Sequence, residues 1–241
     1  MATIVLIPGA DGRAWGWHRV VPLLRERGHT PLAVDLPIAD PAAGLAEVTD
    51  TLLAAIGKEH STQDGKLIIV GQSLAGFIAP LVCERIRADL LVLLNAMVPR
   101  PGESAGEWWA ATGHDQARAA YGEFDLMRDF FHDVPAEVTA AAFAAPPPEG
   151  PSERLFADSW PLDHWPNVPT RFLQGVDDRF FPLEFQRRVV RERLGLELDE
   201  MPGGHLLALS QPEELARRLD RYSATVTPNQ TDGPSDEPRS L

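Results

Sequence analysis

Short runs of apolar residues alternate with longer stretches of helical spacing along most of the chain. Residues 3–7 form a nearly continuous apolar run, which is typical of a parallel strand covered on both faces. In residues 15–27 the apolar positions recur at three- and four-residue intervals, and Gly28 is placed to end the helix that this spacing predicts. The same patterns predict strands at 3–7, 31–35, 67–70, 90–94, 170–174 and 196–201, and helices at 15–27, 41–56, 74–86, 182–193 and 212–222.

Strands that alternate with helices indicate βαβ units. We therefore predict the α/β fold class, with a mostly parallel, doubly wound sheet of about six strands. The alternation stops between residues 96 and 169, where we find no strand pattern and only short helical pieces, at 103–112, 115–121, 125–132 and 135–145. We predict that this segment is a helical lid inserted into a core formed by residues 1–95 and 170–224. The polar tail, 225–241, is predicted to be disordered.

Composition and charge narrow the choice of partners. The 241 residues, 44 % of them hydrophobic, fit one globular domain with an insertion. Thirty-five acidic against 22 basic residues give a net charge of −13, so nucleic acid and anionic membrane surfaces are not expected as partners. The single cysteine excludes an intrachain disulfide, and neither a signal peptide nor a membrane span is predicted. We expect a cytoplasmic protein, monomeric or homodimeric, that acts on a small molecule.

A serine stands where the third predicted strand turns into the next helix. The sequence there is GQSLAG, with Ser73 in its third position. This is where a nucleophile elbow belongs, a strained turn that holds a serine oxygen clear of the sheet. Small residues are needed two positions before and two after the serine because the strand and helix backbones approach closely. Gly71 meets the first need, and Ala75 takes the place of the usual glycine at the second.

Aspartate and histidine follow the serine at the ends of two later strands. Asp177 and Asp178 come after the strand predicted at 170–174, and His205 lies on a glycine-rich loop after the last strand. The order Ser, Asp, His is that of one hydrolase fold and differs from the orders of chymotrypsin and subtilisin. Because all these residues follow the carboxyl ends of strands, where open α/β sheets place their sites, we expect them to lie together.

Several stretches resemble the α/β-hydrolases, and specifically the compact branch that contains plant-type esterases and hydroxynitrile lyases. These stretches are LIPGADGRAWGW at 6–17, VVPLL at 20–24, GH at 28–29 and VDLP at 34–37. The resemblance covers roughly residues 3–95 and 168–222. It departs from the family in one place, because Pro8 precedes Gly9 where the family usually has histidine, and this puts the rigidity of the loop in question.

The resemblance implies roles for five residues. Ser73 is the expected nucleophile, His205 its general base and Asp178 the acid that orients the imidazole. The backbone N–H groups of Ala10 and Leu74 are expected to form the oxyanion hole.

The resemblance also favours Asp178 over Asp177, because the family places its acid three residues after a glycine, here Gly175. We expect no cofactor. Several other histidines stand beside an aspartate, but their spacings match no zinc pattern, so no metal is expected either.

Other conspicuous residues have plainer explanations. Cys83, about three turns into the helix after Ser73, is expected to pack in the core. Asp11 adjoins the oxyanion loop and is expected to point away from it, because a carboxylate would oppose the developing negative charge; the sequence assigns no role to Arg13.

Four tryptophans of the lid could pack it onto the core or line an apolar pocket above the serine, and the sequence leaves both readings open. They are Trp108, Trp109, Trp160 and Trp165.

These patterns predict a serine hydrolase that cleaves a small carboxylic ester, lactone or thioester through an acyl-enzyme. Two alternatives keep the same fold. A carbon–carbon bond hydrolase or a hydroxynitrile lyase would use the same triad on another substrate, and a ligand-binding protein would retain the triad but turn over slowly. Fold alone does not select the substrate.

Overall fold

Six parallel strands form one sheet, as the sequence patterns predict. The computed structural model describes residues 1–60, 65–144 and 149–227. The strands lie in the order β2-β1-β3-β4-β5-β6, and every neighbouring pair is parallel. All six carboxyl ends therefore lie at one edge of the sheet. The strands are β1 (Ala2–Ile7), β2 (Thr30–Ala33), β3 (Lys66–Gln72), β4 (Leu90–Leu94), β5 (Thr170–Gly175) and β6 (Asp199–Met201).

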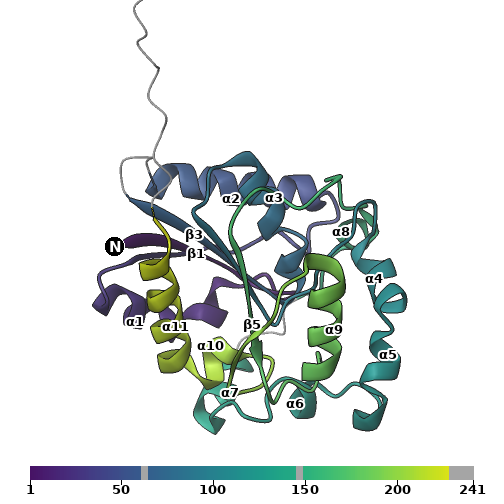
Figure 1. Cartoon of the computed structure of the whole chain (residues 1–241). Helices are drawn as coiled ribbons and strands as arrows, with labels where there is room; N and C mark the ends of the chain where they lie inside the picture. The colour runs from purple at the N-terminus through teal and green to yellow at the C-terminus, as the bar shows by residue number, and fades with distance from the viewer. Residues whose placement is uncertain (61–64, 145–148, 228–241) are drawn as a thin grey trace, which may run out of the picture.

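Helices cover both faces of the sheet (Figure 1). One face packs against α1 (Val20–Glu26) and α11 (Pro212–Thr225), and the other against α2 (Leu45–Glu59), α3 (Ala79–Arg85) and α9 (Leu183–Leu194). Successive strand residues serve opposite faces, because side chains alternate along a strand. Burial on both sides is the reason that β1 and β4 are almost wholly apolar in sequence, whereas the half-buried edge strand β6 begins with two acidic residues.

This alternation is clear in β1. Ile4 and Leu6 join the apolar cluster beneath α1 and α11, whereas Val5 and Ile7 join the cluster beneath α2, α3 and α9. All four side chains are fully buried. This inner strand of the sheet thus contributes to two separate cores.

Segment 96–169 is helical among its described residues and adds no strand to the sheet. Its only β pairing there is an isolated bridge between Ser104 and Ser159. In Figure 1 its helices α4 to α7 follow one side and the lower end of the molecule. The elements are α4 (Ala105–Thr112), α5 (His114–Ala117), the 3₁₀ turn η3 (Ala119–Tyr121), α6 (Leu126–Asp129), α7 (Ala136–Ala142) and α8 (Glu153–Ala157).

Several predicted boundaries were wrong. The helix predicted at 15–27 is a 3₁₀ turn η1 (Ala14–Trp17) followed by α1, and the helix predicted at 74–86 is likewise a 3₁₀ turn η2 (Ser73–Gly76) followed by α3. The helix predicted from 41 begins only at Leu45. The short helices α8 and α10 (Leu207–Ser210) were not predicted. Short 3₁₀ turns share the apolar spacing of a helix start, so periodicity alone does not separate them.

The end of the chain also differs from the prediction. The predicted start of the disordered tail, residue 225, is too early by at least one residue, because Thr225 is the last residue of α11. Residues 228–241 of that tail lie outside the described part, as does the last residue of the helix predicted at 135–145. The strand predicted at 196–201 is confined to Asp199–Met201, since this edge strand pairs with only three residues of β5.

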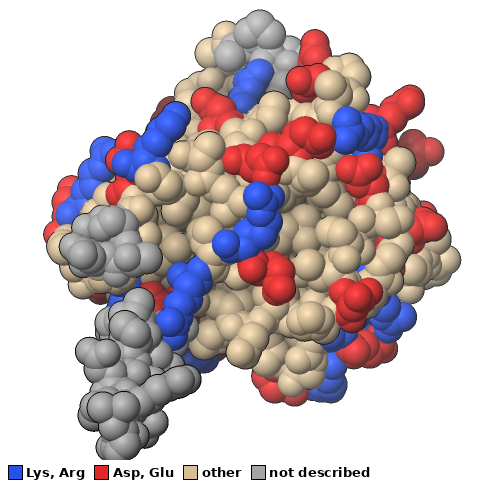
Figure 2. Space-filling view, turned by 90° about the horizontal axis from the view of Figure 1, so that it is seen from above, with Lys and Arg blue, Asp and Glu red and all other residues tan. Residues whose placement is uncertain are grey.

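The described helices include none that is long and apolar enough to cross a membrane. On the face shown in Figure 2, acidic and basic side chains are interspersed among uncharged ones. That face carries no extended basic patch of the kind that nucleic-acid binding uses.

The fold predicts a large difference between two glycine-to-alanine substitutions. Gly76→Ala should lower the free energy of unfolding by about 1–3 kcal/mol, because the added methyl group would overlap the carbonyl oxygen of Met97. Gly57→Ala, on the exposed surface of α2 where nothing lies within 4 Å, should be neutral or stabilising by about 0.5–1 kcal/mol. Urea denaturation of both variants measures the difference; equal stabilities would contradict the close approach at Gly76.

Candidate active site

Ser73 occupies a strained turn at the carboxyl end of β3. Its φ is 55°, in the left-handed region that residues other than glycine seldom adopt. Such strain costs about 1–3 kcal/mol and persists only where the surroundings hold it. β3 ends at Gln72 and η2 begins at Ser73, so no loop separates the strand from the 3₁₀ turn.

Close backbone approaches around the turn account for its small residues. An added Cβ at Gly71 would lie 2.8 Å from the Cβ of Ala79, and Ala75 is itself completely buried. The tightest position is Gly76, which abuts the backbone of Met97. The serine motif explains the small residues two positions before and after Ser73. It does not explain Gly76, which packs against the turn after β4.

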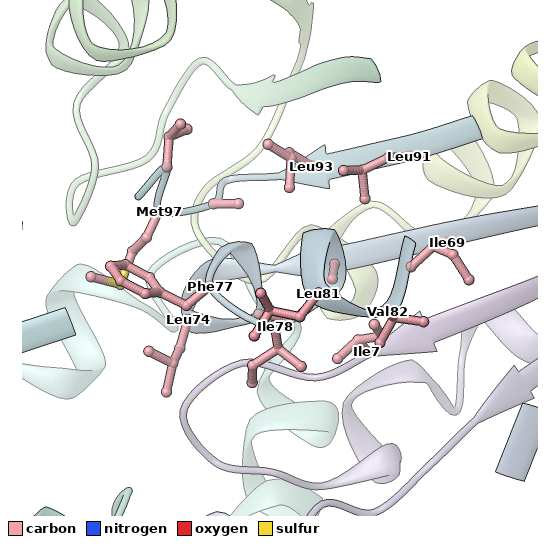
Figure 3. Close-up of a cluster of buried hydrophobic side chains, with 14 of the residues drawn as sticks. Ile7, Ile69, Leu74, Phe77, Ile78, Leu81, Val82, Leu91, Leu93 and Met97 are labelled. Carbon is pink, nitrogen blue, oxygen red and sulfur yellow. The ribbon is translucent and has the colours of Figure 1, made fainter. Parts of the chain in front are cut away.

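An apolar cluster holds the residues that follow Ser73. Leu74, Phe77 and Ile78 belong to the same buried cluster as Ile7 of β1 and Met97, and the ring of Phe77 lies beside the side chain of Met97 (Figure 3). All three of the residues that follow the serine are at most 3 % exposed. Burial of this much apolar surface offsets the conformational strain at the serine.

His205 connects Ser73 to Asp178. Its Nδ1 lies 2.8 Å from Oδ2 of Asp178, and its Nε2 lies 3.1 Å from Oγ of Ser73. An ionised carboxylate only accepts, so Nδ1 donates to it, and Nε2 is left to accept the serine hydroxyl proton. Ser73 is 7 % exposed, and Asp178 and His205 are each 1 % exposed. The structure thus brings together Ser73, His205 and the aspartate that the family resemblance favoured over Asp177.

The two adjacent aspartates have different partners. Oδ1 of Asp178 accepts hydrogen bonds from the backbone N–H groups of Phe180 and Phe181 at 2.8 and 2.9 Å, which leaves Oδ2 facing the imidazole. Asp177 instead accepts from the N–H of Gly203 at 3.1 Å. Asp178 therefore orients the imidazole directly, whereas Asp177 ties its own turn to the histidine loop.

Aromatic rings surround the imidazole of His205. Phe130 stacks on it with ring centroids 4.5 Å apart and an interplanar angle of 25°. Phe180 and Phe181 present their edges, each with its centroid 5.2 Å from that of the imidazole. No sequence motif marked these phenylalanines, although only Arg179 separates the pair at 180–181 from the aspartates. Three aromatic rings thus form much of the surroundings of the imidazole.

The helical segment is also bonded to the histidine loop. Oδ2 of Asp133 accepts the N–H of Gly204 at 2.7 Å. Just before Phe130, the fully buried Asp129 accepts Arg118 at 2.6 Å and Arg128 at 2.9 Å. Burial works against ionisation of Asp129, but its hydrogen bonds and the two arginine charges outweigh that cost and lower its pKa. These contacts hold in place the backbone around Phe130, whose ring stacks on the imidazole.

The loop expected to supply the first oxyanion donor passes beside Ser73. An added Cβ at Gly9 would lie 3.1 Å from the serine Cβ, and the N–H of Gly12 closes a turn onto the carbonyl of Gly9 at 3.0 Å. Ala10 is inside this turn and its N–H is not the group that closes it. Leu74 lies in the first turn of η2, where N–H groups have no acceptor within the helix. Both expected donors therefore adjoin the serine.

Comparison with known proteins places the chain in a family. The model of the alpha/beta hydrolase family matches residues 4–218. The chain belongs to the alpha/beta hydrolase family.

Its relatives and structural neighbours include esterases. A probable esterase of rice, Oryza sativa, is 26 % identical over 258 residues, which cover 91 % of this chain and 96 % of the relative. A pyrethroid hydrolase of Sphingobium wenxiniae is 26 % identical over 91 % of this chain and 87 % of its own. The crystal structure of a pyrethroid hydrolase from Sphingobium faniae superposes with a TM-score of 0.73 at 22 % identity, covering 93 % of this chain and 98 % of that one. This chain is an α/β-hydrolase with esterase relatives.

Two of the four tryptophans act in packing in this α/β-hydrolase. Trp108 and Trp160 are almost completely buried, and their indole N–H groups donate to the carbonyls of Val98 at 3.0 Å and Phe77 at 3.2 Å. The bond from Trp160 joins segment 96–169 to the core, whereas Trp108 bonds within the segment and packs its ring against Phe181 and Phe185. The structure therefore favours packing over a pocket for this pair.

The other two tryptophans are half-buried. Trp109 packs against Phe180 and Phe181, with centroids 5.7 and 6.1 Å apart, so it reaches the aromatic surroundings of the imidazole. Trp165 donates to Oγ1 of Thr170 at 3.0 Å and packs beside the buried tryptophan at 160. Trp109 is thus the tryptophan best placed to contact a substrate.

Asp11 and Arg13 line an open cleft of about 590 Å³ formed by residues 11–15, 35–40 and 149. Burial raises the pKa of the Asp11 carboxyl, opposed by a hydrogen bond from the backbone N–H of Arg13. Ser73 is not among the lining residues, so this cleft lies apart from the serine. Among the described residues no three His, Cys, Asp or Glu side chains are grouped so as to hold a metal ion.

Cys83 is predicted to be unreactive while the protein is folded. Cys83 as a residue is only partly buried, but the packing around its thiol raises the pKa of that group, and the thiolate is the reactive form. Labelling with Ellman's reagent at pH 8 should therefore be slow in the native protein and fast after unfolding in guanidinium. Because the chain has one cysteine, the signal is unambiguous. Rapid stoichiometric labelling of the native protein would contradict the burial.

Proposed function

We propose that this protein is a serine hydrolase that cleaves a small carboxylic ester, lactone or thioester through an acyl-enzyme on Ser73. One observation carries the proposal. A buried imidazole lies within hydrogen-bond distance of both a strained serine hydroxyl and a carboxylate, at 3.1 and 2.8 Å. Acyl transfer through a serine requires a nucleophile, a general base in contact with it and a group that orients the base, and these contacts provide all three. The family and its esterase members support the same reaction class.

The first half of the proposed reaction forms the acyl-enzyme. Oγ of Ser73 attacks the carbonyl carbon of the substrate while Nε2 of His205 takes the hydroxyl proton. The carbonyl oxygen becomes an oxyanion, and the backbone N–H groups of Ala10 and Leu74 donate to it. When this intermediate collapses, the bond to the leaving alcohol or thiol breaks, and His205 returns the proton to that group.

The second half repeats these steps with water. His205 takes a proton from the water molecule as its oxygen attacks the acyl carbon, and the same N–H groups hold the oxyanion. Collapse releases the carboxylic acid and returns the proton to Ser73. Throughout, Asp178 keeps the imidazole in the tautomer with hydrogen on Nδ1 and stabilises the imidazolium. Its second oxygen is already held by two backbone N–H groups, so the carboxylate does not need to reorient.

The aromatic surroundings favour a substrate with an apolar group beside the scissile bond. Phe130, Phe180 and Phe181 exclude water from the imidazole on several sides, and the half-buried Trp109 extends this apolar surface. Apolar walls with a few polar groups are typical of sites for small molecules. We infer that small apolar or aromatic esters suit the site better than charged ones.

Ser73→Ala is expected to reduce turnover of p-nitrophenyl esters by several orders of magnitude, because no other group can form the acyl-enzyme. The variant should remain folded, since alanine fills the same space. Steady-state kinetics with a series of short to medium acyl chains, run on both proteins, measures this. Undiminished activity in the variant would refute the assignment of the nucleophile, and absence of turnover in the wild type would refute ester hydrolysis of this class.

The adjacent aspartates provide a matched pair. Asp178→Asn should lower kcat by roughly 10³- to 10⁴-fold, because the amide favours the wrong imidazole tautomer. Asp177→Asn keeps an oxygen to accept the N–H of Gly203, so kcat should stay within about threefold of wild type. The same p-nitrophenyl assay compares the two variants. Equal losses in both would show that the effect comes from the turn and not from the carboxylate at the imidazole.

A further inference from the structure

The turn that follows β4 lies at the centre of the edge where the reacting residues meet. β4 is paired with β3 on one side and with β5 on the other. Ser73 follows β3, Asp178 follows β5 and His205 follows the next strand, β6. A residue at the carboxyl end of β4 is therefore the one placed to contact all three loops.

Asn95, the first residue after β4, bonds two of these loops through its side chain. Its Oδ1 accepts the N–H of Gly175, which begins the turn of the acid, at 2.7 Å. Its Nδ2 donates to the carbonyls of Gly204 and His205, at 2.9 and 3.0 Å. One amide thus spans from the acid turn to the backbone of the histidine itself.

The same turn also contacts the nucleophile. Two residues after Asn95, the N–H of Met97 donates to the carbonyl of Ser73 at 3.0 Å. The carbonyl of Met97 in turn abuts Gly76, directly after the serine turn. Residues 95–97 therefore form a junction between the nucleophile, acid and base segments.

Asn95 has the features of a residue fixed for this purpose. It is 0 % exposed and has a φ of 43°, in the left-handed region. Asparagine tolerates this conformation better than most residues, and both hydrogens of its amide are used. An aspartate of the same shape would turn a carboxylate oxygen toward two carbonyl oxygens, and alanine would leave all three backbone groups without their partner.

We propose that Asn95 is a positioning residue for the hydrolysis: it sets the separation of the acid turn and the histidine loop so that one imidazole reaches both Asp178 and Ser73. The inference rests on the proposed function. Loss of the amide lets the two loops shift relative to each other, and a misplacement of about 1 Å costs roughly 10²-fold in rate. Substrate binding, which depends on other surfaces, changes less.

The chain offers a matched control. Gln186 is also 0 % exposed, and its Nε2 donates to the carbonyl of Ala96 at 2.9 Å, one residue from Asn95. Within the described part of the chain, its side chain forms no hydrogen bond to the acid turn or to the histidine loop. Gln186→Leu removes an equally buried amide from the same turn and so measures the general cost of such a loss.

The experiment compares Asn95→Ala, Asn95→Gly and Asn95→Asp with Gln186→Leu. Steady-state kinetics with a p-nitrophenyl ester gives kcat and KM for each protein that folds. We expect kcat to fall about 10- to 100-fold in Asn95→Ala and Asn95→Gly with KM within about threefold, and kcat of Gln186→Leu to stay within about threefold. Asn95→Gly separates loss of the amide from strain, because glycine adopts the left-handed conformation freely.

A proton NMR spectrum supplies a reading that does not depend on turnover. The far-downfield signal of an imidazole N–H bonded to a carboxylate, assigned by its absence in His205→Ala, reports the contact with Asp178. It should persist in Gln186→Leu and be shifted or lost in the Asn95 variants. If Asn95→Ala and Asn95→Gly do not fold, Asn95→Asp, which keeps the shape, is decisive. Its kcat relative to wild type should fall as pH rises and its carboxyl ionises against the two carbonyls.

Two results would overturn the proposal. The first is wild-type kcat and an unchanged downfield signal in folded Asn95 variants. The second is an equal loss of kcat in Gln186→Leu, which would show that any buried amide in this turn matters equally. A wild type that hydrolyses no ester refutes the proposed function instead, and in that case the NMR comparison still tests the positioning of the imidazole.

Discussion

A serine held in a left-handed conformation at the end of a central parallel strand is the constraint on which the rest of this site depends. The strain at Ser73 requires that strand, turn and helix be clamped together, and close backbone approaches at Gly71 and Gly76 provide the clamp. The apolar side chains that follow the serine add the burial that makes the strained turn stable. Without this clamp the hydroxyl would relax toward the sheet and away from the imidazole.

The second constraint is that the loops which carry such deeply buried groups expose backbone carbonyl and N–H groups that need hydrogen-bond partners. Side-chain amides perform much of this work. Asn95 bonds the acid turn and the histidine loop, Gln72 donates to the carbonyl of His205 at 3.3 Å, and Gln174 donates to the carbonyl of Phe181 at 3.0 Å. An amide can donate and accept at once, so it joins loops whose exposed groups differ, and it does so without adding charge beside the imidazole.

The helical segment contributes both an apolar surface and a fixed position for it. Phe130 stacks on the imidazole, and the buried ion pairs of Asp129 and the bond from Asp133 to Gly204 hold the neighbouring backbone. Trp160 bonds another part of the segment to the core, and Trp108 packs against Phe181 and Phe185 of the core. A rigid ring beside the imidazole keeps water away and strengthens the electrostatic interactions among the reacting groups.

The sequence by itself determined the features that are written in local patterns. Continuous apolar runs identified the strands, because residues on both faces are buried, and the serine motif together with the order Ser, Asp, His located Ser73, Asp178 and His205 at strand ends. Boundaries at the 3₁₀ turns were misplaced, since these turns share the apolar spacing of helices.

The tertiary structure decided which distant residues support that site. Asn95 and His205 are 110 positions apart in the chain, and no local pattern connects them. The inserted helices likewise decide whether Phe130 stacks on the imidazole and which tryptophans are buried. Their packing depends on surfaces that meet only after the chain has folded. The spacing of apolar residues predicts whether a side chain is buried, but the geometry of the folded chain determines which residues it contacts.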